Sequence, residues 1–207
     1  MAKQGYHHGN LRQALVEATL ALIAEKGPQG FTMAEAAKRA EVSTAAPYRH
    51  FSGREALIAE AARQGFEIFV TRMEAAFDEG RPNPLAAFMA TGRAYLAFAR
   101  SNAGHYVAMF ESGLSVNTTP ELAEVAGRAQ GVLTHAAAAL SAHLPSEHRP
   151  PAAMFAAHVW ALSHGVVELF TRGAPGARSS YPPEDLLESG ICIYLRGLGL
   201  IPPDNEP

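Results

Sequence analysis

The 207-residue chain has room for one domain of ordinary size, or for a small and a medium domain. Hydrophobic residues make up 48% and charged residues 18%, a globular composition that excludes an intrinsically disordered chain. The net charge of −3 argues against indiscriminate nucleic-acid binding. Residues 1–65 nevertheless carry eight Lys or Arg against six Asp or Glu (+2), and the remainder carries nine against fourteen (−5). A mildly basic head on an acidic body favours local attraction to phosphate groups.

The single cysteine, Cys192, excludes a disulfide within one chain and suits a reducing compartment. The polar segment 1–10 lacks the apolar core of a signal peptide, and no stretch approaches the ~20 apolar residues of a membrane span. We therefore expect a cytoplasmic protein with no membrane partner.

Apolar residues at helical spacing predict a first helix between Asn10, a fitting N-cap, and the stop at Gly27-Pro28. A second, short helix starts after Thr32, whose spacing to Glu35 is that of a capping box. After a break at residues 41–43, a third short helix is expected through residue 51.

The remainder of the chain also has helical patterning. A second capping-box pair, Ser52 and Glu55, opens a long helix that ends at Gly80. Further helices are expected over residues 84–100, 103–114, 120–143, 152–172 and 184–198, with a linker at 145–151, a loop at 173–183 and a tail at 202–207. No segment alternates as a strand would, so the predicted class is all-α with about nine helices.

Two short helices behind a longer one, over residues 31–51, have the layout of a helix-turn-helix module. The small side chains of Ala36, Ala37 and Ala40 allow the second helix to pack closely on the first. The third helix would then present polar and small residues outward, and such a helix can enter the major groove of DNA with its first turn closest to the bases.

The stretch FTMAEAAKRAEVSTAAPYRHFSGREAL, preceded by YHHGNLRQALVEATL, resembles the TetR family of transcriptional regulators over about residues 10–65. Trp160, His164 and Gly165 resemble the variant of that family whose regulatory domain carries a Trp-His-Gly motif. The resemblance implies a helix-turn-helix DNA-binding domain at 1–52, a ligand-binding and dimerisation domain at 53–201, and a tail at 202–207.

Three positions depart from the family pattern. Glu41 stands where the turn usually carries glycine, and because a positive φ there would be costly, the turn is expected to be adjusted. Pro47 lies early in the third helix, where a proline is tolerated only in the first turn, so that helix is expected to start at Ser43 or Thr44. Arg54 replaces the more common lysine and keeps the charge.

The resemblance and the residue chemistry together assign DNA contacts. Base contacts need side chains in the first turn of the third helix, and phosphate contacts need donors around it. The candidates are Thr44 and Ala45 for bases, Tyr48, His50, Arg54 and the N–H end capped by Thr32 for phosphates, and Arg49 for either.

Each candidate has a structural alternative. Tyr48 would serve equally as a core tyrosine with its hydroxyl outward, His50 as a cap of the helix C-terminus, and Arg54 as a solvated charge. Tyr6, His7, His8 and Arg12 either form an arm that reaches the DNA backbone or play no part in binding.

The C-terminal region is expected to bind a small-molecule inducer and to form a homodimer. An aromatic- and Met-rich set with a few polar groups suits a ligand pocket, although such residues usually fill a core. The candidate ligand-binding residues are Phe88, Tyr95, His105, Tyr106, Met109, Phe110, Trp160 and His164. The candidate dimer residues, which the protomer core would equally accommodate, are Phe155, Val159, Leu162, Val166, Phe170, Leu186, Ile191 and Tyr194.

Trp160, His164 and Glu168 share one helix face, so His164 either hydrogen-bonds Glu168, helps to bind a metal, or is simply a satisfied core histidine. No catalytic residue, metal site or cofactor is predicted, because no nucleophile elbow, phosphate-binding glycine loop or zinc-protease motif occurs. The expected function is a ligand-responsive repressor that binds palindromic operator DNA. An activator with this fold, or a ligand binder that no longer binds DNA, remains open.

Overall fold

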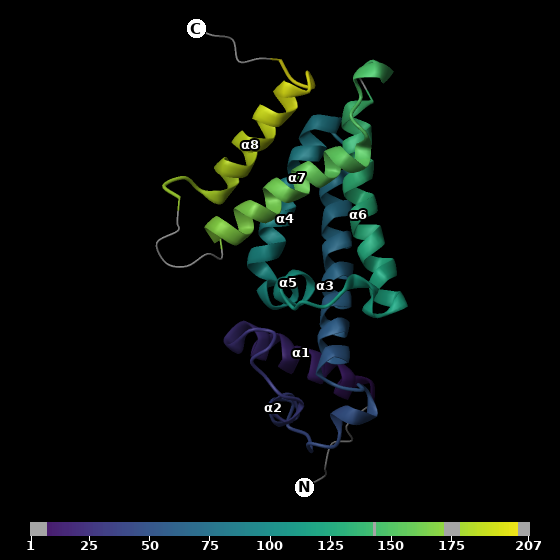
Figure 1. The fold of residues 1–207 in the computed structure, drawn as a ribbon, viewed down its shortest axis with the longest axis vertical. Helices are drawn as coiled ribbons and strands as arrows, with labels where there is room; N and C mark the ends of the chain where they lie inside the picture. The colour runs from purple at the N-terminus through teal and green to yellow at the C-terminus, as the bar shows by residue number, and fades with distance from the viewer. Residues whose placement is uncertain (1–7, 143, 172–178, 203–207) are drawn as a thin grey trace. The chain divides into compact units, whose positions relative to one another are not determined.

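The computed structural model describes residues 8–142, 144–171 and 179–202 (Figure 1). Over these residues it contains helices, turns and loops and no strand, which confirms the all-α prediction. The α-helices are α1 (His8–Lys26), α2 (Met33–Arg39), α3 (Arg54–Phe77), α4 (Pro84–Ser101), α5 (Ala103–Phe110), α6 (Pro120–Ser141), α7 (Ala152–Val166) and α8 (Pro183–Gly197). The short turns are the 3-10 helices η1 (Pro47–Arg49), η2 (Asp78–Gly80), η3 (Val116–Thr118) and η4 (Ser146–His148), and the π-helical turn η5 (Val167–Thr171).

Internal contacts divide the chain into two compact units. The first comprises Met1–Ile68 with Asn102–Ala126, and the second comprises Phe69–Ser101 with Gly127–Pro207. The first unit therefore contains the beginning of α3 and all of α5 in addition to the segment expected to bind DNA. The predicted functional boundary after residue 52 stays a prediction.

In the first unit, α1 packs against both α2 and α5. Leu15, Val16 and Ile23 of α1 are fully buried in its core. Gly104 allows α5 to approach α1 closely, because a Cβ atom there would lie 2.9 Å from the carbonyl oxygen of Leu20. The close packing of α1 against α5 thus supports the segment that contains α2.

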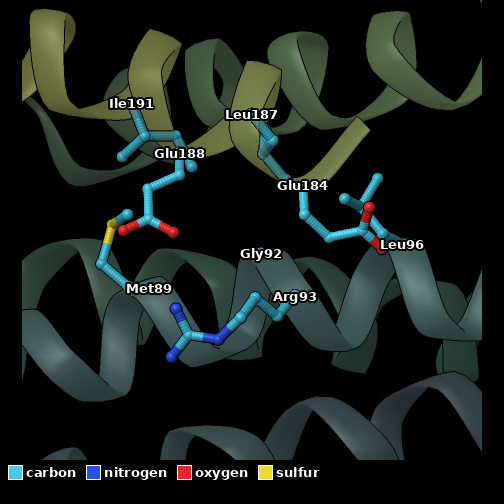
Figure 2. A pocket seen from close by; sticks show the side chains of 8 residues that line it. All are labelled: Met89, Gly92, Arg93, Leu96, Glu184, Leu187, Glu188 and Ile191. Atoms are coloured by element: carbon cyan, nitrogen blue, oxygen red, sulfur yellow. The ribbon is translucent and has the colours of Figure 1, made fainter. Parts of the chain in front are cut away.

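The second unit is built from aromatic contacts among α3, α4, α7 and α8. The rings of Phe69 and Phe98 meet edge to face at 5.2 Å, and Phe88 and Phe155 lie 5.3 Å apart. Figure 2 shows the side chains of α4 and α8 that line a shallow hollow between these two helices. Gly92 lets the helices approach there, since a Cβ atom on it would lie 3.4 Å from Leu187.

Two predicted helix starts differ from the structure. The helix α1 begins at His8, so Asn10 lies inside it and is not its N-cap. The helix α3 begins at Arg54, and the carbonyl oxygen of Gly53 accepts a hydrogen bond from the amide of Leu57. Gly53 therefore occupies the N-cap position, and Ser52, which was predicted to be the N-cap, lies one residue before it.

The expectation that no segment approaches a membrane span was wrong. Residues 152–170, which form α7 and most of η5, have the length and composition of such a span. Core helices of water-soluble proteins share these properties, and α7 packs on α4 and α8 through Phe155, Ala156 and Val159. Its apolar composition is therefore no indication of a membrane protein.

Candidate DNA-binding face and effector region

The capping box at the start of α2 is present as predicted. The Thr32 side chain accepts a hydrogen bond from the amide of Glu35 at 3.2 Å, and the Glu35 carboxylate accepts one from the amide of Thr32 at 2.8 Å. Hydrogen bonds from Lys26 and Thr32 lower the pKa of Glu35 to about 2. The Thr32 hydroxyl and the Glu35 carboxylate therefore hold the start of α2 in place, and a phosphate contact at this helix end stays a prediction.

The predicted third helix is replaced by a shorter structure, which corrects the sequence-based expectation. A turn closed by the hydrogen bond from Ala46 N–H to the Ser43 carbonyl leads into the 3-10 helix η1. Pro47 begins η1 and has no N–H to donate to Ser43, so a regular α-helical turn cannot form across it. Only the amide of Phe51 makes an α-type bond, to the carbonyl of Pro47.

This segment presents the predicted contact residues outward. Thr44, Ala45 and Arg49 are exposed, and Tyr48 is 60% exposed, which rules out its alternative role as a core tyrosine. Pro47 and Phe51 face inward and are buried. The short segment therefore separates an anchoring side from a polar outer side, as a DNA-reading element requires.

Glu41, in the turn before this segment, has a φ of 56°. The left-handed conformation places a Cβ atom close to the backbone and favours glycine. The expected adjustment of the turn does not occur, so Glu41 keeps this left-handed backbone at an energetic cost.

His50 and Arg54 are less available than the outer residues. His50 is half-buried and ends η1, where its amide donates to the Pro47 carbonyl. Arg54 donates hydrogen bonds to the carbonyl of Pro28 at 3.3 Å and to the side chain of Gln29 at 2.5 Å. These bonds join the start of α3 to the α1–α2 loop, so a phosphate contact by Arg54 would compete with them.

Sequence reasoning missed an ion-pair network in the first unit. Arg12 of α1 binds the carboxylate of Glu60 through both terminal nitrogens, at 2.9 and 3.1 Å, and its guanidinium lies over the Phe51 ring. Arg63 adds two further hydrogen bonds to Glu60, each 2.9 Å long. Burial opposes ionisation of Glu60, but the bonds from Arg63 and Gln64 and the positive charges lower its pKa to about 2.

The predicted DNA-contacting arm is not supported at the one position whose side chain is described. Arg12 is held by Glu60, and its 48-residue separation from that partner gave no local sequence signal. Tyr6 and His7 lie outside the described residues, and the structure describes His8 only as the first residue of α1.

Four of the predicted ligand-binding residues lie in the second unit, and three of them form a polar cluster. The hydroxyl of Tyr95 lies 3.0 Å from Nδ1 of His164 and accepts a hydrogen bond from Nε1 of Trp160 at 3.3 Å. His164 is therefore paired with Tyr95 rather than with Glu168 through this nitrogen. Phe88, the fourth residue, packs against Phe155.

The other four predicted ligand-binding residues lie on α5 in the first unit. Tyr106 is fully buried, with its ring 4.9 Å from that of Phe110, and Phe110 meets Phe66 edge to face. Met109 is also buried, and desolvation lowers the pKa of the half-buried His105. Within their unit, these residues serve core packing.

The predicted dimer residues divide by burial. Phe155, Val159 and Ile191 belong to the protomer core, whereas Leu162 is 38% exposed. The remaining four are half-buried, namely Val166, Phe170, Leu186 and Tyr194. The sequence analysis missed two strongly exposed apolar residues, Met154 and Leu169, which are 55% and 59% exposed. Ile193, which the apolar pattern of the last helix includes, is 65% exposed.

Comparison with known proteins agrees with this architecture. A sequence profile described as bacterial regulatory proteins of the tetR family matches residues 15–61, and one described as the tetracyclin repressor-like C-terminal domain matches residues 88–193. The chain therefore belongs to the TetR family and is a transcriptional regulator with a helix-turn-helix DNA-binding domain, not an enzyme. The assignment of Trp160, His164 and Gly165 to the Trp-His-Gly variant stays a prediction.

Solved structures have the same fold. A protein of unknown function from Rhodococcus sp. RHA1 is 25% identical, with coverage of 94% of this chain and 98% of its own and a TM-score of 0.78. The TetR family regulator PfmR from Thermus thermophilus is 18% identical, with coverage of 88% and 97% and a TM-score of 0.68. The fatty acid degradation regulator FadR from Bacillus halodurans is 15% identical, with coverage of 95% and 98% and a TM-score of 0.72. A search of curated proteins finds no significant match.

Proposed function

We propose that this chain is a cytoplasmic repressor that binds palindromic operator DNA as a homodimer and is released by a small molecule. The observation that carries the proposal is the outward display of Thr44, Tyr48 and Arg49 on a segment anchored by buried Pro47 and Phe51. A core-forming role would not leave these side chains exposed together. The basic balance of residues 1–65 supports the same assignment.

The DNA contacts follow from the chemistry of the exposed residues. Thr44 and Ala45 begin the segment and are the candidates for base contacts, with the Ala45 methyl suited to a thymine methyl. The Tyr48 hydroxyl and the amides at the start of α2 are suited to phosphate oxygens. We assign Arg49, at the end of η1, to a phosphate, and we give Arg54 only a secondary role because of its bonds to Pro28 and Gln29.

The proposed dimer face consists of Met154, Leu162 and Leu169 on α7 and η5 and Ile193 on α8. At 100° per residue, Met154 and Leu162 fall on one side of α7, and Leu169 follows in η5. Leu162 also approaches Gly190 of α8, since a Cβ atom there would lie 4.0 Å from it, so the two exposed surfaces adjoin. A continuous exposed apolar face on two packed helices is suited to a twofold four-helix interface.

The release step requires a ligand that binds the two states of the regulator unequally. Two heads of a dimer must lie about 34 Å apart to read successive major grooves. A ligand that favours a conformer with a different spacing lowers operator affinity without touching DNA. The Tyr95–Trp160–His164 cluster in the second unit is the proposed centre of ligand recognition.

Selection of binding sites from random duplex DNA tests the proposal. We expect enrichment of a palindrome whose half-sites lie one helical turn apart, and absence of enrichment from denatured and refolded protein would contradict it. A salt series with Arg49→Ala refines the assignment. Loss of a phosphate contact lowers the salt slope by about 0.9 for all sequences, whereas loss of preference at one base pair would show that Arg49 reads a base.

A further inference from the structure

An open groove lies between the last turns of α3 and the middle of α6, within the second unit (Figure 1). Its volume of about 390 Å³ falls in the range of pockets that hold small molecules. The residues that line it include Glu74 and Phe77 of α3 on one side and Arg128, Gly131, Val132 and His135 of α6 on the other. None of them belongs to the proposed effector cluster or to the proposed dimer face, so this groove is a separate feature of the unit.

The inner surface of the groove is apolar. The Phe77 side chain is only 6% exposed, and the His135 ring meets it edge to face at 5.4 Å. The half-buried Val132 adds further apolar surface from α6. Gly131 keeps the groove open, because a Cβ atom on it would meet no other atom within 4 Å. An apolar or aromatic group can therefore lie against Phe77 and Val132.

The two sides of the groove carry opposite charges. Glu74 is exposed on the α3 side, and Arg128 is exposed on the α6 side. The side chains of both are without an ion pair or hydrogen bond to any described residue, so they do not pair across the groove. Glu79 of η2 also lines the groove, but it lies 4.0 Å from Arg81 and is partly compensated. The groove thus presents one free carboxylate and one free guanidinium on facing sides.

We propose that this groove binds a small zwitterion, namely an α-amino acid with an apolar or aromatic side chain. The guanidinium of Arg128 is suited to donate two hydrogen bonds to a carboxylate, and the carboxylate of Glu74 is suited to accept them from an ammonium group. The side chain of the amino acid lies against Phe77 and gains from its burial. A ligand with only one of the two charges leaves one facing group without a partner. The inference goes beyond the proposed function and does not depend on it.

Three related compounds test the proposal on the full-length protein by ligand-observed NMR titration. L-phenylalanine carries both charges, its amide keeps only the ammonium group, and 3-phenylpropionate keeps only the carboxylate. We expect saturable binding of L-phenylalanine with a Kd at least about fivefold lower than that of either analogue. Equal affinity for the three compounds, or no saturable binding of L-phenylalanine, would overturn the proposal.

Two glycines of α6 test whether the ligand occupies this groove. Gly127 and Gly131 lie one turn apart, both are exposed, and both have open space where a Cβ atom would stand, but only Gly131 lines the groove. Gly131→Leu is expected to fill the groove and to weaken binding of L-phenylalanine at least about tenfold. Its thermal midpoint should be unchanged or higher, since leucine favours a helix more than glycine does.

The matched control is Gly127→Leu, which gains the same helix propensity outside the groove and should bind L-phenylalanine as the parent protein does. Unchanged binding in Gly131→Leu, or an equal loss in both variants, would overturn the placement of the ligand in the groove.

Charge substitutions test the two assigned contacts. Arg128→Gln should bind L-phenylalanine and its amide equally, and Glu74→Gln should bind L-phenylalanine and 3-phenylpropionate equally, because each variant lacks the group that reads the difference. Arg93→Gln is the control, since Arg93 is an exposed arginine of α4 outside the groove (Figure 2), and both preferences should persist in it. Preferences that persist in Arg128→Gln and Glu74→Gln would show that both groups are merely solvated surface charges.

Discussion

Arg12 of α1 and Glu60 of α3 form a bidentate ion pair that joins these two helices. Both terminal nitrogens of Arg12 reach the carboxylate, at 2.9 and 3.1 Å, and the Glu60 side chain is only 7% exposed. The same guanidinium covers Phe51, the buried residue that follows η1. The pair therefore connects α1, the long helix α3 and the exposed segment around Tyr48.

Neutralising Glu60 should destabilise the protein, because two arginines lose their shared carboxylate. We expect Glu60→Gln to lower the free energy of unfolding by about 2 to 3 kcal/mol, which is less than the loss of about 3 to 5 kcal/mol for a fully buried pair because Arg12 is half-exposed. Glu67→Gln is the matched control, since Glu67 pairs with Arg63 at 2.6 Å but is 49% exposed, and exposed pairs contribute less than about 1 kcal/mol. Equal losses in urea unfolding would contradict the special role of Glu60.

Replacing Glu41 by glycine should stabilise the protein. Its φ of 56° is strained for a residue with a Cβ atom, and glycine relieves that strain at some cost in unfolded-chain entropy. The expected net gain is about 0.5 to 1 kcal/mol in urea unfolding. Glu41→Ala removes the same charge and keeps the Cβ atom, so a matching gain in that variant would show that charge, not backbone strain, is responsible.

The free energy of unfolding should fall in two stages as the pH is lowered. Desolvation holds the folded-state pKa of His105 below its ordinary value of 6.5, so its contribution is present above that pH and is lost as pH falls below it. Glu60 and Glu35, with folded pKa values of about 2 against 4.5, add a second loss between pH 4.5 and 2.

The first stage has a specific control. His105 changes the stability by at most about 1.4 kcal/mol per pH unit. In chemical unfolding across pH 7.5 to 5.5, His105→Gln should be less pH-dependent than the parent protein. A variant with the parent's slope would remove His105 as the cause.

A charge in the exposed apolar face should separate the protomers. We expect Ile193→Asp to sediment as a monomer with an unchanged helix content, because an unpaired carboxylate cannot enter the interface. Val116→Asp is a suitable control, since Val116 is also exposed, at 41%, but lies on η3 in the first unit. Dimers of normal strength in Ile193→Asp would place the interface elsewhere.

The sequence predicted local features well and long-range ones poorly. The bond between Thr32 and Glu35 followed from a three-residue spacing, and the strain at Glu41 followed from its place in a known turn. The third helix was predicted too long because Pro47 was expected to fit inside its first turn, whereas the structure begins the 3-10 helix η1 at Pro47. The Arg12–Glu60 pair spans 48 residues, beyond the reach of any periodicity.

The predicted dimer residues also show that sequence patterns do not resolve long-range packing. Helical spacing identified α7 and α8 as apolar, but it did not separate the buried Phe155 and Ile191 from the exposed Met154 and Ile193. That distinction depends on which side of each helix faces α4, and only packing decides it.

The central claim is that the exposed segment around Tyr48 reads an operator. Fluorescence anisotropy on the selected palindrome, compared with a scrambled duplex of equal length, measures this directly. We predict saturable binding of one dimer to the palindrome, at least about tenfold weaker in Tyr48→Ala and unchanged in Tyr181→Ala, a similarly exposed tyrosine in the second unit. Equal affinity for both duplexes, or full affinity in Tyr48→Ala, would contradict the account.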